Sequence, residues 1–181
     1  KSIDDIKQYL ITKQPGTAVF HANFFEKNKK SPKRDWFILS QINEYGFNDA
    51  RQTLNSLSVG KRSVEHIMPE TLTDAWIDDL KKGTGITDNS VIKELHKANI
   101  HKWGNMTPMN KWSNSMLKNI IFHEKNDHVE GFKQSNASIN PDIENYAQND
   151  TQYPDKWWSI DSIKDRTTAL GVLAEQIFKV E

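Results

Sequence analysis

The chain has 181 residues, of which 36% are hydrophobic and 27% are charged, and its 24 basic residues balance its 24 acidic residues. This composition is typical of a folded soluble domain with its own core, and it argues against a protein that holds nucleic acid through its overall field. The absence of cysteine excludes disulfides, thiolate metal sites and cysteine nucleophiles, so any metal must bind to His, Asp, Glu or Asn.

The apolar spacing predicts a chain that is mainly helical. Ser2 is the expected N-cap of the first helix, with Asp5 completing a capping pair three residues later. The last helix is the longest amphipathic segment, with Ile163 and Leu170 on the face expected to be buried. Helices are expected over residues 2–13, 34–45, 48–57, 72–82, 89–100 and 160–180.

Two short segments, 62–67 and 102–109, have the pattern of strands. Glu65 and His66 stand together near the end of the first, shortly before Pro69. Neighbours on a strand point to opposite faces, so both side chains can serve one site only if the strand ends there and the chain bends. On these two residues alone, a surface pair at a strand end is the simpler interpretation.

The segment 101–125 changes that balance. Its strand carries Gly104 and Asn105, and Asn114 follows at the start of a helical pattern. The order is therefore a strand with a His, a strand with an Asn, and a helix with a second Asn. This constellation resembles the HNH (His-Me finger) nucleases, in which a ββα unit holds one divalent metal against the scissile phosphate.

A narrower resemblance lies in three blocks, "EHIMP", "GNMT" and "NSMLKNIIFHEK", within residues 59–125. They are similar to the C-terminal nuclease domain of GmrSD-type modification-dependent restriction proteins, and the likeness extends to Trp158 and Arg166. Glu70 departs from the pattern, because the family often has Gln there. The 38 positions between His66 and Asn105 form a helical insertion that the resemblance implies and that compact toxin nucleases would lack.

The resemblance implies a role for each motif residue. His66 resembles the general base that activates the attacking water, and Asn105 resembles the structural Asn that pins the loop and orients the His. Glu65 and Asn114 resemble the metal ligands, and oxygen ligands of this kind suit Mg²⁺ or Mn²⁺ rather than Zn²⁺.

Two further positions match the family pattern with less defined roles. Asn119 is the alternative to Asn114 as a metal ligand, and Lys125 could neutralise a phosphate oxygen. Four other histidines near the motif are expected to be structural, because no pair of them has the i, i+4 spacing of a helical zinc site backed by a third ligand. They are His96, His101, His123 and His128.

Charge is unevenly distributed along the chain. Residues 26–34 contain five basic residues and one acid, whereas residues 141–155 contain four acids and no base. A solvated loop and an acidic linker are the simpler interpretation, and a face for phosphates is the functional one. The residues expected to bind DNA are Lys29, Lys30, Lys33, Arg34 and Arg166.

We expect a single α+β, mostly helical domain built on a ββα-metal finger and flanked by N- and C-terminal helices. Lys1 in place of Met indicates a piece of a longer protein, and the resemblance implies an N-terminal nucleotide-hydrolysing and sensing region as a partner. Within residues 1–181 we expect a helical N-terminal segment over 1–58, a core over 59–130 with its insertion at about 70–101, and an acidic loop and final helix over 131–181.

The predicted function is a metal-dependent DNA endonuclease of a bacterial restriction or anti-phage defence system. It would act in the cytoplasm on DNA with or without modified bases, and no membrane partner is expected, because no apolar run approaches the roughly 20 residues that span a bilayer. The alternative is a catalytically silent nucleic-acid-binding or scaffold module with the same shape. His66, Asn105 and Asn114 favour the enzyme, since a module that only binds has no need of all three.

Overall fold

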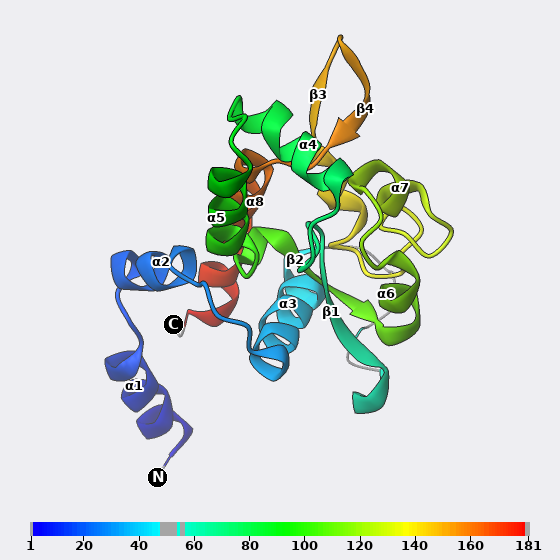
Figure 1. Cartoon of the computed structure of the whole chain (residues 1–181). Coiled ribbons are helices and arrows are strands. Elements are labelled where there is room, and N and C mark those ends of the chain that lie inside the picture. The colour runs from blue at the N-terminus through cyan, green and yellow to red at the C-terminus, as the bar shows by residue number, and fades with distance from the viewer. Residues whose placement is uncertain (1, 48–53, 55–56, 180–181) are drawn as a thin grey trace.

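The computed structural model describes residues 2–47, 54 and 57–179 (Figure 1). Helices dominate it, and two small antiparallel sheets complete it, so the expected α+β, mostly helical class is confirmed. The helices are α1 (Ile3–Lys13), α2 (Thr17–Phe25), α3 (Pro32–Gly46), α4 (Asp74–Thr84), α5 (Asn89–Asn99), α6 (Lys111–Leu117), α7 (Phe122–Asp127) and α8 (Ile160–Phe178). The strands are β1 (Arg62–His66), β2 (Met106–Asn110), β3 (Gln148–Asp150) and β4 (Tyr153–Trp157), and short 3₁₀ turns occupy η2 (Val59–Lys61), η3 (Trp103–Asn105) and η4 (Pro141–Tyr146).

The centre of the molecule is the ββα unit formed by β1, β2 and α6. The two strands pair antiparallel, with Glu65 opposite Thr107 and His66 opposite Met106. Helix α6 follows β2 without a loop, because the side chain of Asn110 accepts from the backbone N–H of Ser113 and caps the new helix. Strand, strand and helix thus follow the order that the motif predicts.

The insertion between the two strands is helical, as expected. Helices α4 and α5 lie above the β1–β2 pair in Figure 1 and close onto it through an apolar core. The side chains of Trp76, Leu80 and Ile92 are fully buried there. The indole N–H of Trp76 also donates to the carbonyl oxygen of Ile120 at 3.1 Å, which ties α4 to the end of the ββα unit.

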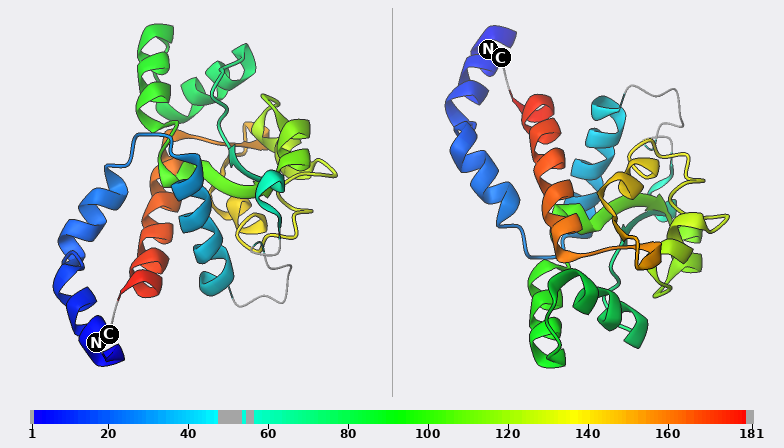
Figure 2. Two further views of the ribbon diagram at one scale, coloured as in Figure 1. Left: turned by 90° about the horizontal axis from the view of Figure 1, so that it is seen from below. Right: turned by 90° about the horizontal axis from the view of Figure 1, so that it is seen from above.

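Helix α8 supports the unit from behind. It lies between α2 and α3 (Figure 2) and contacts η3, the turn that leads into β2. The approach is so close that a Cβ at Gly104 would clash with the carbonyl oxygen of Ile163, so only glycine fits at this position. The backbone N–H of Gly104 donates to Thr167 Oγ1 at 2.9 Å and fixes the turn against the helix.

Several expectations from the sequence need correction. Helix α2 has no counterpart among the predicted helices. The acidic segment 141–155 is not a linker, because it holds η4, β3 and the start of β4. Glu144 in this segment forms ion pairs through its Oε1 with the ammonium groups of Lys133 at 3.2 Å and Lys156 at 3.1 Å. The capping box of Ser2 and Asp5 is confirmed, but Ile3 on that helix is 84% exposed, so the apolar stripe of α1 covers no core.

Two further predicted elements, one helix and one strand, are not found over the full ranges expected from the sequence. Most of the helix expected over residues 48–57 lies outside the described residues. The strand expected over 102–109 begins later, at Met106, because the 3₁₀ turn η3 occupies the first half of that segment.

Within the described portion of the chain, no helix is both long enough and apolar enough to cross a bilayer. The boundaries proposed for the three segments of the domain stay predictions.

Candidate active site

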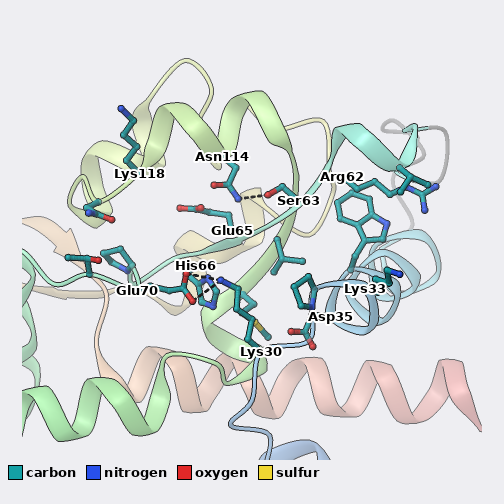
Figure 3. Close-up of a pocket in the computed structure, with 18 residues that line it drawn as sticks. Lys30, Lys33, Asp35, Arg62, Ser63, Glu65, His66, Glu70, Asn114 and Lys118 are labelled. Atoms are coloured by element: carbon teal, nitrogen blue, oxygen red, sulfur yellow. Dashed lines mark hydrogen bonds and ion pairs between the residues drawn. The ribbon is translucent and has the colours of Figure 1, made fainter.

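A cavity of about 810 Å³ opens along β1, between α3 and α6 (Figure 3). It collects polar side chains from the segment before α3, from β1, from the turn after β1 and from α6. The chain thereby brings several predicted site residues to one place. The polar residues that line the cavity include Lys30, Lys33, Glu65, His66, Glu70, Asn114, Lys118 and Asn119.

Glu65 and His66 share this cavity because β1 ends at His66 and the chain turns there. Both are nearly buried, with 5% and 7% of their surface exposed. Lys125 Nζ donates to Glu65 Oε1 at 2.5 Å and to the carbonyl oxygen of His66 at 2.9 Å, so one side chain holds both residues at the strand end. Burial raises the pKa of Glu65 and lowers that of Lys125, and the charge of each partner opposes the effect of burial on the other.

The His66 ring faces a second imidazole. Its Nε2 lies 3.1 Å from Nδ1 of His101, a hydrogen bond in which one ring donates and the other accepts. Burial, aided by the nearby positive groups and opposed by Glu70, lowers the pKa of His66 to about 3. The imidazole is therefore neutral near neutral pH, which is the form that accepts a proton.

The amide of Asn105 is fully buried and uses its complete hydrogen-bonding capacity. Its Oδ1 accepts from the backbone N–H of Met68 at 2.8 Å and from Nε1 of Trp158 at 3.2 Å. Its Nδ2 donates to the carbonyl oxygens of Met68 at 2.9 Å and Ile100 at 3.0 Å. Asn105 does not line the cavity, so its geometry suits a residue that positions the turn after His66 rather than one that touches substrate.

Two other side chains hold the same turn. Nε2 of His96 lies 2.8 Å from the carbonyl oxygen of Pro69. Lys30 Nζ donates to both carboxylate oxygens of Glu70 at 2.8 Å, in a pair whose side chains are each about half exposed. Burial raises the pKa of Glu70, but Lys30, His66 and His101 outweigh it and hold this pKa below its ordinary value.

Asn114 is placed on the cavity wall by a hydrogen bond to β1. Its Nδ2 donates to Ser63 Oγ at 2.8 Å, which fixes the amide and leaves its oxygen for other contacts. Figure 3 shows Asn114, Glu65 and His66 following one another along the same wall. Asn119 also lines the cavity but is exposed beyond the end of α6, whereas Asn114 is half-buried within that helix.

Two basic residues do not occupy the positions that their predicted roles need. Arg166 is fully buried and its Nη1 donates to the carbonyl oxygens of Gly104 and Met106, both at 2.9 Å, so the prediction that it binds DNA is wrong. Burial lowers its pKa to about 10, which leaves it charged at neutral pH. Lys125 is also fully buried against Glu65 and does not line the cavity, so it cannot neutralise a phosphate oxygen as expected.

The basic segment 26–34 divides between two surfaces. Lys30 and Lys33 line the cavity, whereas Lys29 and Arg34 line a neighbouring groove. Lys118, at the end of α6, adds a third lysine to the cavity and was not singled out from the sequence. Lys118 directly follows the helix that carries Asn114, and this place in the motif is the signal that could have identified it.

The family of the chain follows from a comparison made over most of its length. The family model described as "GmrSD restriction endonucleases, C-terminal domain" matches residues 15–172. The chain belongs to this family. The resemblance drawn from the three sequence blocks is therefore confirmed, and the domain is of the restriction-endonuclease type. Comparisons with curated proteins and with solved structures give no match.

The buried pair in this GmrSD-type domain makes a prediction about stability. Lys125→Met should lower the free energy of unfolding by about 3–5 kcal/mol, because it leaves the Glu65 carboxylate buried without a partner. Chemical denaturation measures the loss, and the double variant Glu65→Gln/Lys125→Met should recover some of it. Lys133→Met is the control, since Lys133 pairs at the surface and its loss should cost less than about 1 kcal/mol. Equal stabilities of Lys125→Met and wild type would contradict the prediction.

Proposed function

We propose that this domain is an HNH endonuclease that hydrolyses phosphodiester bonds of DNA with a divalent metal, within a bacterial restriction or anti-phage defence system. The observation that carries the proposal is the meeting of Glu65, His66 and Asn114 on one wall of a cavity, in a ββα unit of a restriction-endonuclease family. DNA, with or without modified bases, is the proposed substrate. An N-terminal nucleotide-hydrolysing and sensing region is the proposed partner that chooses the target.

His66 is the proposed general base. In the tautomer in which its Nε2 donates to His101, Nδ1 is the acceptor that takes the proton from the attacking water. A negatively charged phosphate bound beside the ring would raise the pKa of His66 from about 3 toward the range in which proton transfer is efficient. Asn105 acts as a positioning residue, because it fixes the turn that follows the ring.

Glu65 and Asn114 are the proposed metal ligands, with Asn119 as the alternative to Asn114. Glu65 meets Lys125 through Oε1, so its second oxygen is the one to offer to a cation, and Asn114 offers its amide oxygen. Oxygen ligands and an open cavity suit Mg²⁺ or Mn²⁺, which keep several waters. The bound ion supplies positive charge against the developing negative charge of the phosphate and the leaving oxygen.

Lys30, Lys33 and Lys118 are proposed to hold the DNA backbone, since all three line the cavity beside the motif residues. Contacts of this kind go to phosphates and carry no sequence information. The proposed binding is therefore non-specific in the isolated domain. Contacts of Lys29 and Arg34 with DNA stay predictions, because these residues face the neighbouring groove.

The His66→Ala variant provides the direct test of catalysis. We expect plasmid cleavage in the presence of Mg²⁺ to fall at least about 10²-fold, because a positioned general base contributes roughly 10²–10⁴-fold. Omission of Mg²⁺ should have the same effect on the wild type. Circular dichroism of the variant checks that it is folded. Near wild-type cleavage by folded His66→Ala would remove His66 from the mechanism, and a wild type that binds DNA without cleaving it would favour the silent module.

A variant of Asn114 tests the metal site. Asn114→Ala should need a higher Mn²⁺ concentration for half-maximal cleavage while its affinity for DNA stays near wild type, since few protein ligands hold the ion. Titration of Mn²⁺ at fixed DNA measures the shift. Asn119→Ala is the matched control on the same cavity. A shift in Asn119→Ala and none in Asn114→Ala would transfer the ligand role to Asn119.

The salt dependence of DNA binding tests which lysines face the backbone. Each phosphate contact contributes about 0.9 to the slope of log affinity against log salt, so Lys33→Ala/Lys118→Ala should reduce that slope by up to about 2. The double variant Lys29→Ala/Arg34→Ala, in the neighbouring groove, should change it less. Fluorescence anisotropy over a salt series measures both slopes. A larger effect of Lys29→Ala/Arg34→Ala would place the DNA along the other groove.

A further inference from the structure

We propose that His66, Glu70 and His101 form a second cation site, for a transition metal of the Zn²⁺ type, and that an ion bound there switches the general base off. One nitrogen from each histidine and one oxygen of Glu70 all lie within 4.8 Å of one another. Two histidines and one carboxylate are a donor set that proteins use for Zn²⁺ with an open position left over. No local sequence pattern assigns such a role to Glu70 or His101.

The two imidazoles are already placed as a metal pair. Nε2 of His66 and Nδ1 of His101 lie 3.1 Å apart. Two nitrogens at about 2.0–2.1 Å from one tetrahedral Zn²⁺ are about 3.4 Å apart, so a small shift of the rings converts the hydrogen bond into two metal bonds. The proton shared by the rings would move, through solvent, to the outer nitrogen of the ring that donates it, so both rings stay neutral as the ion enters. Binding of the ion therefore needs little rearrangement of the buried portion of the site.

The third ligand must leave a lysine to reach the ion. Both oxygens of Glu70 are 2.8 Å from Lys30 Nζ, but both side chains are about half exposed. A pair of this kind contributes only about 0–1 kcal/mol to stability, so its disruption is a small obstacle to a cation with higher charge. Lys30 and the ion thus compete for Glu70, so removal of the Lys30 ammonium group should strengthen the binding of the ion.

The nitrogen donors separate this site from the one proposed for catalysis. Imidazole suits Zn²⁺, Ni²⁺ and Cu²⁺, whereas Mg²⁺ favours oxygen ligands and gives up its waters reluctantly. Glu65 and Asn114 offer only oxygen atoms as ligands. The two proposed sites should therefore select different ions, although Glu65 of one site and His66 of the other are neighbours at the end of β1.

The effect on His66 follows from its tautomer. A neutral imidazole that binds an ion through Nε2 carries its one proton on Nδ1. Nδ1 is the atom that takes the proton from water in the proposed mechanism, so the loaded ring has no free acceptor for it. This inhibition rests on the proposed function, whereas binding of the ion does not.

Binding of Zn²⁺ to the metal-free protein, measured by competition with a chromophoric indicator, tests the site without DNA. We expect one equivalent to bind, with affinity at least about tenfold weaker in His101→Ala and in Glu70→Gln. Lys30→Met should bind Zn²⁺ more tightly than wild type, because it frees Glu70. Two controls should leave the affinity unchanged: Asn114→Ala, in the other site, and His21→Ala, whose ring pairs with Glu175 elsewhere.

The tautomer is read by nitrogen NMR of the histidine rings. Zn²⁺ should shift the Nε2 signal of His66 and place the proton of this ring on Nδ1. Unchanged affinity in both His101→Ala and Glu70→Gln, or no binding by wild type, would overturn the proposal, and so would loss of binding confined to Asn114→Ala. Glu70→Gln keeps the test valid if His101→Ala fails to fold, because Glu70 is exposed. A protein that binds Zn²⁺ at this site but cleaves no DNA with Mg²⁺ would overturn the nuclease proposal alone.

Discussion

The position of the candidate base depends on one buried amide, that of Asn105. Its four hydrogen bonds reach Met68 at the start of the insertion, Ile100 at its end and Trp158 just before the last helix. One side chain thus closes the loop that leaves the first strand and returns to the second. Because the cost of loop closure grows slowly with length, the insertion can carry two helices without moving His66. Loss of the amide would leave several buried backbone groups without partners, which is the expensive kind of hydrogen-bond loss.

The sequence predicts those features of the site that are encoded locally. The strand that ends at His66, the helix that carries Asn114 and the helices of the insertion all follow from spacing within short windows, and the structure contains each of them. The contact between His66 and His101 cannot be predicted from such short windows, because 35 positions separate the two residues and no short-range pattern links them. The same holds for the pairing of Lys30 with Glu70 across 40 positions. Such contacts are set by how α3 and the insertion pack against the strands.

Charge was the least informative signal, because a basic residue can serve the surface or the core. Arg166 satisfies two backbone carbonyls next to β2, and Lys125 neutralises Glu65 in the interior. Lys27 behaves similarly, since its ammonium group donates to the carbonyl oxygen of His101 at 2.8 Å, lies 3.4 Å from Asp35 Oδ1, and has a pKa lowered by burial to about 8. These groups fix the frame of the cavity from behind. The proposed phosphate contacts therefore fall to the lysines that line the cavity itself.

The two carboxylates beside His66 have lysine partners of opposite character. Lys125 is fully buried and cannot leave Glu65 without leaving a buried charge unpaired. A cation bound at Glu65 would therefore share the carboxylate with Lys125. Lys30 is about half exposed and can swing away into water, so a cation at Glu70 can replace it. A hard ion that keeps its waters suits the first arrangement, and an ion that binds imidazole suits the second. The difference in burial of two lysines therefore distinguishes the two proposed cation sites, which meet at a single histidine.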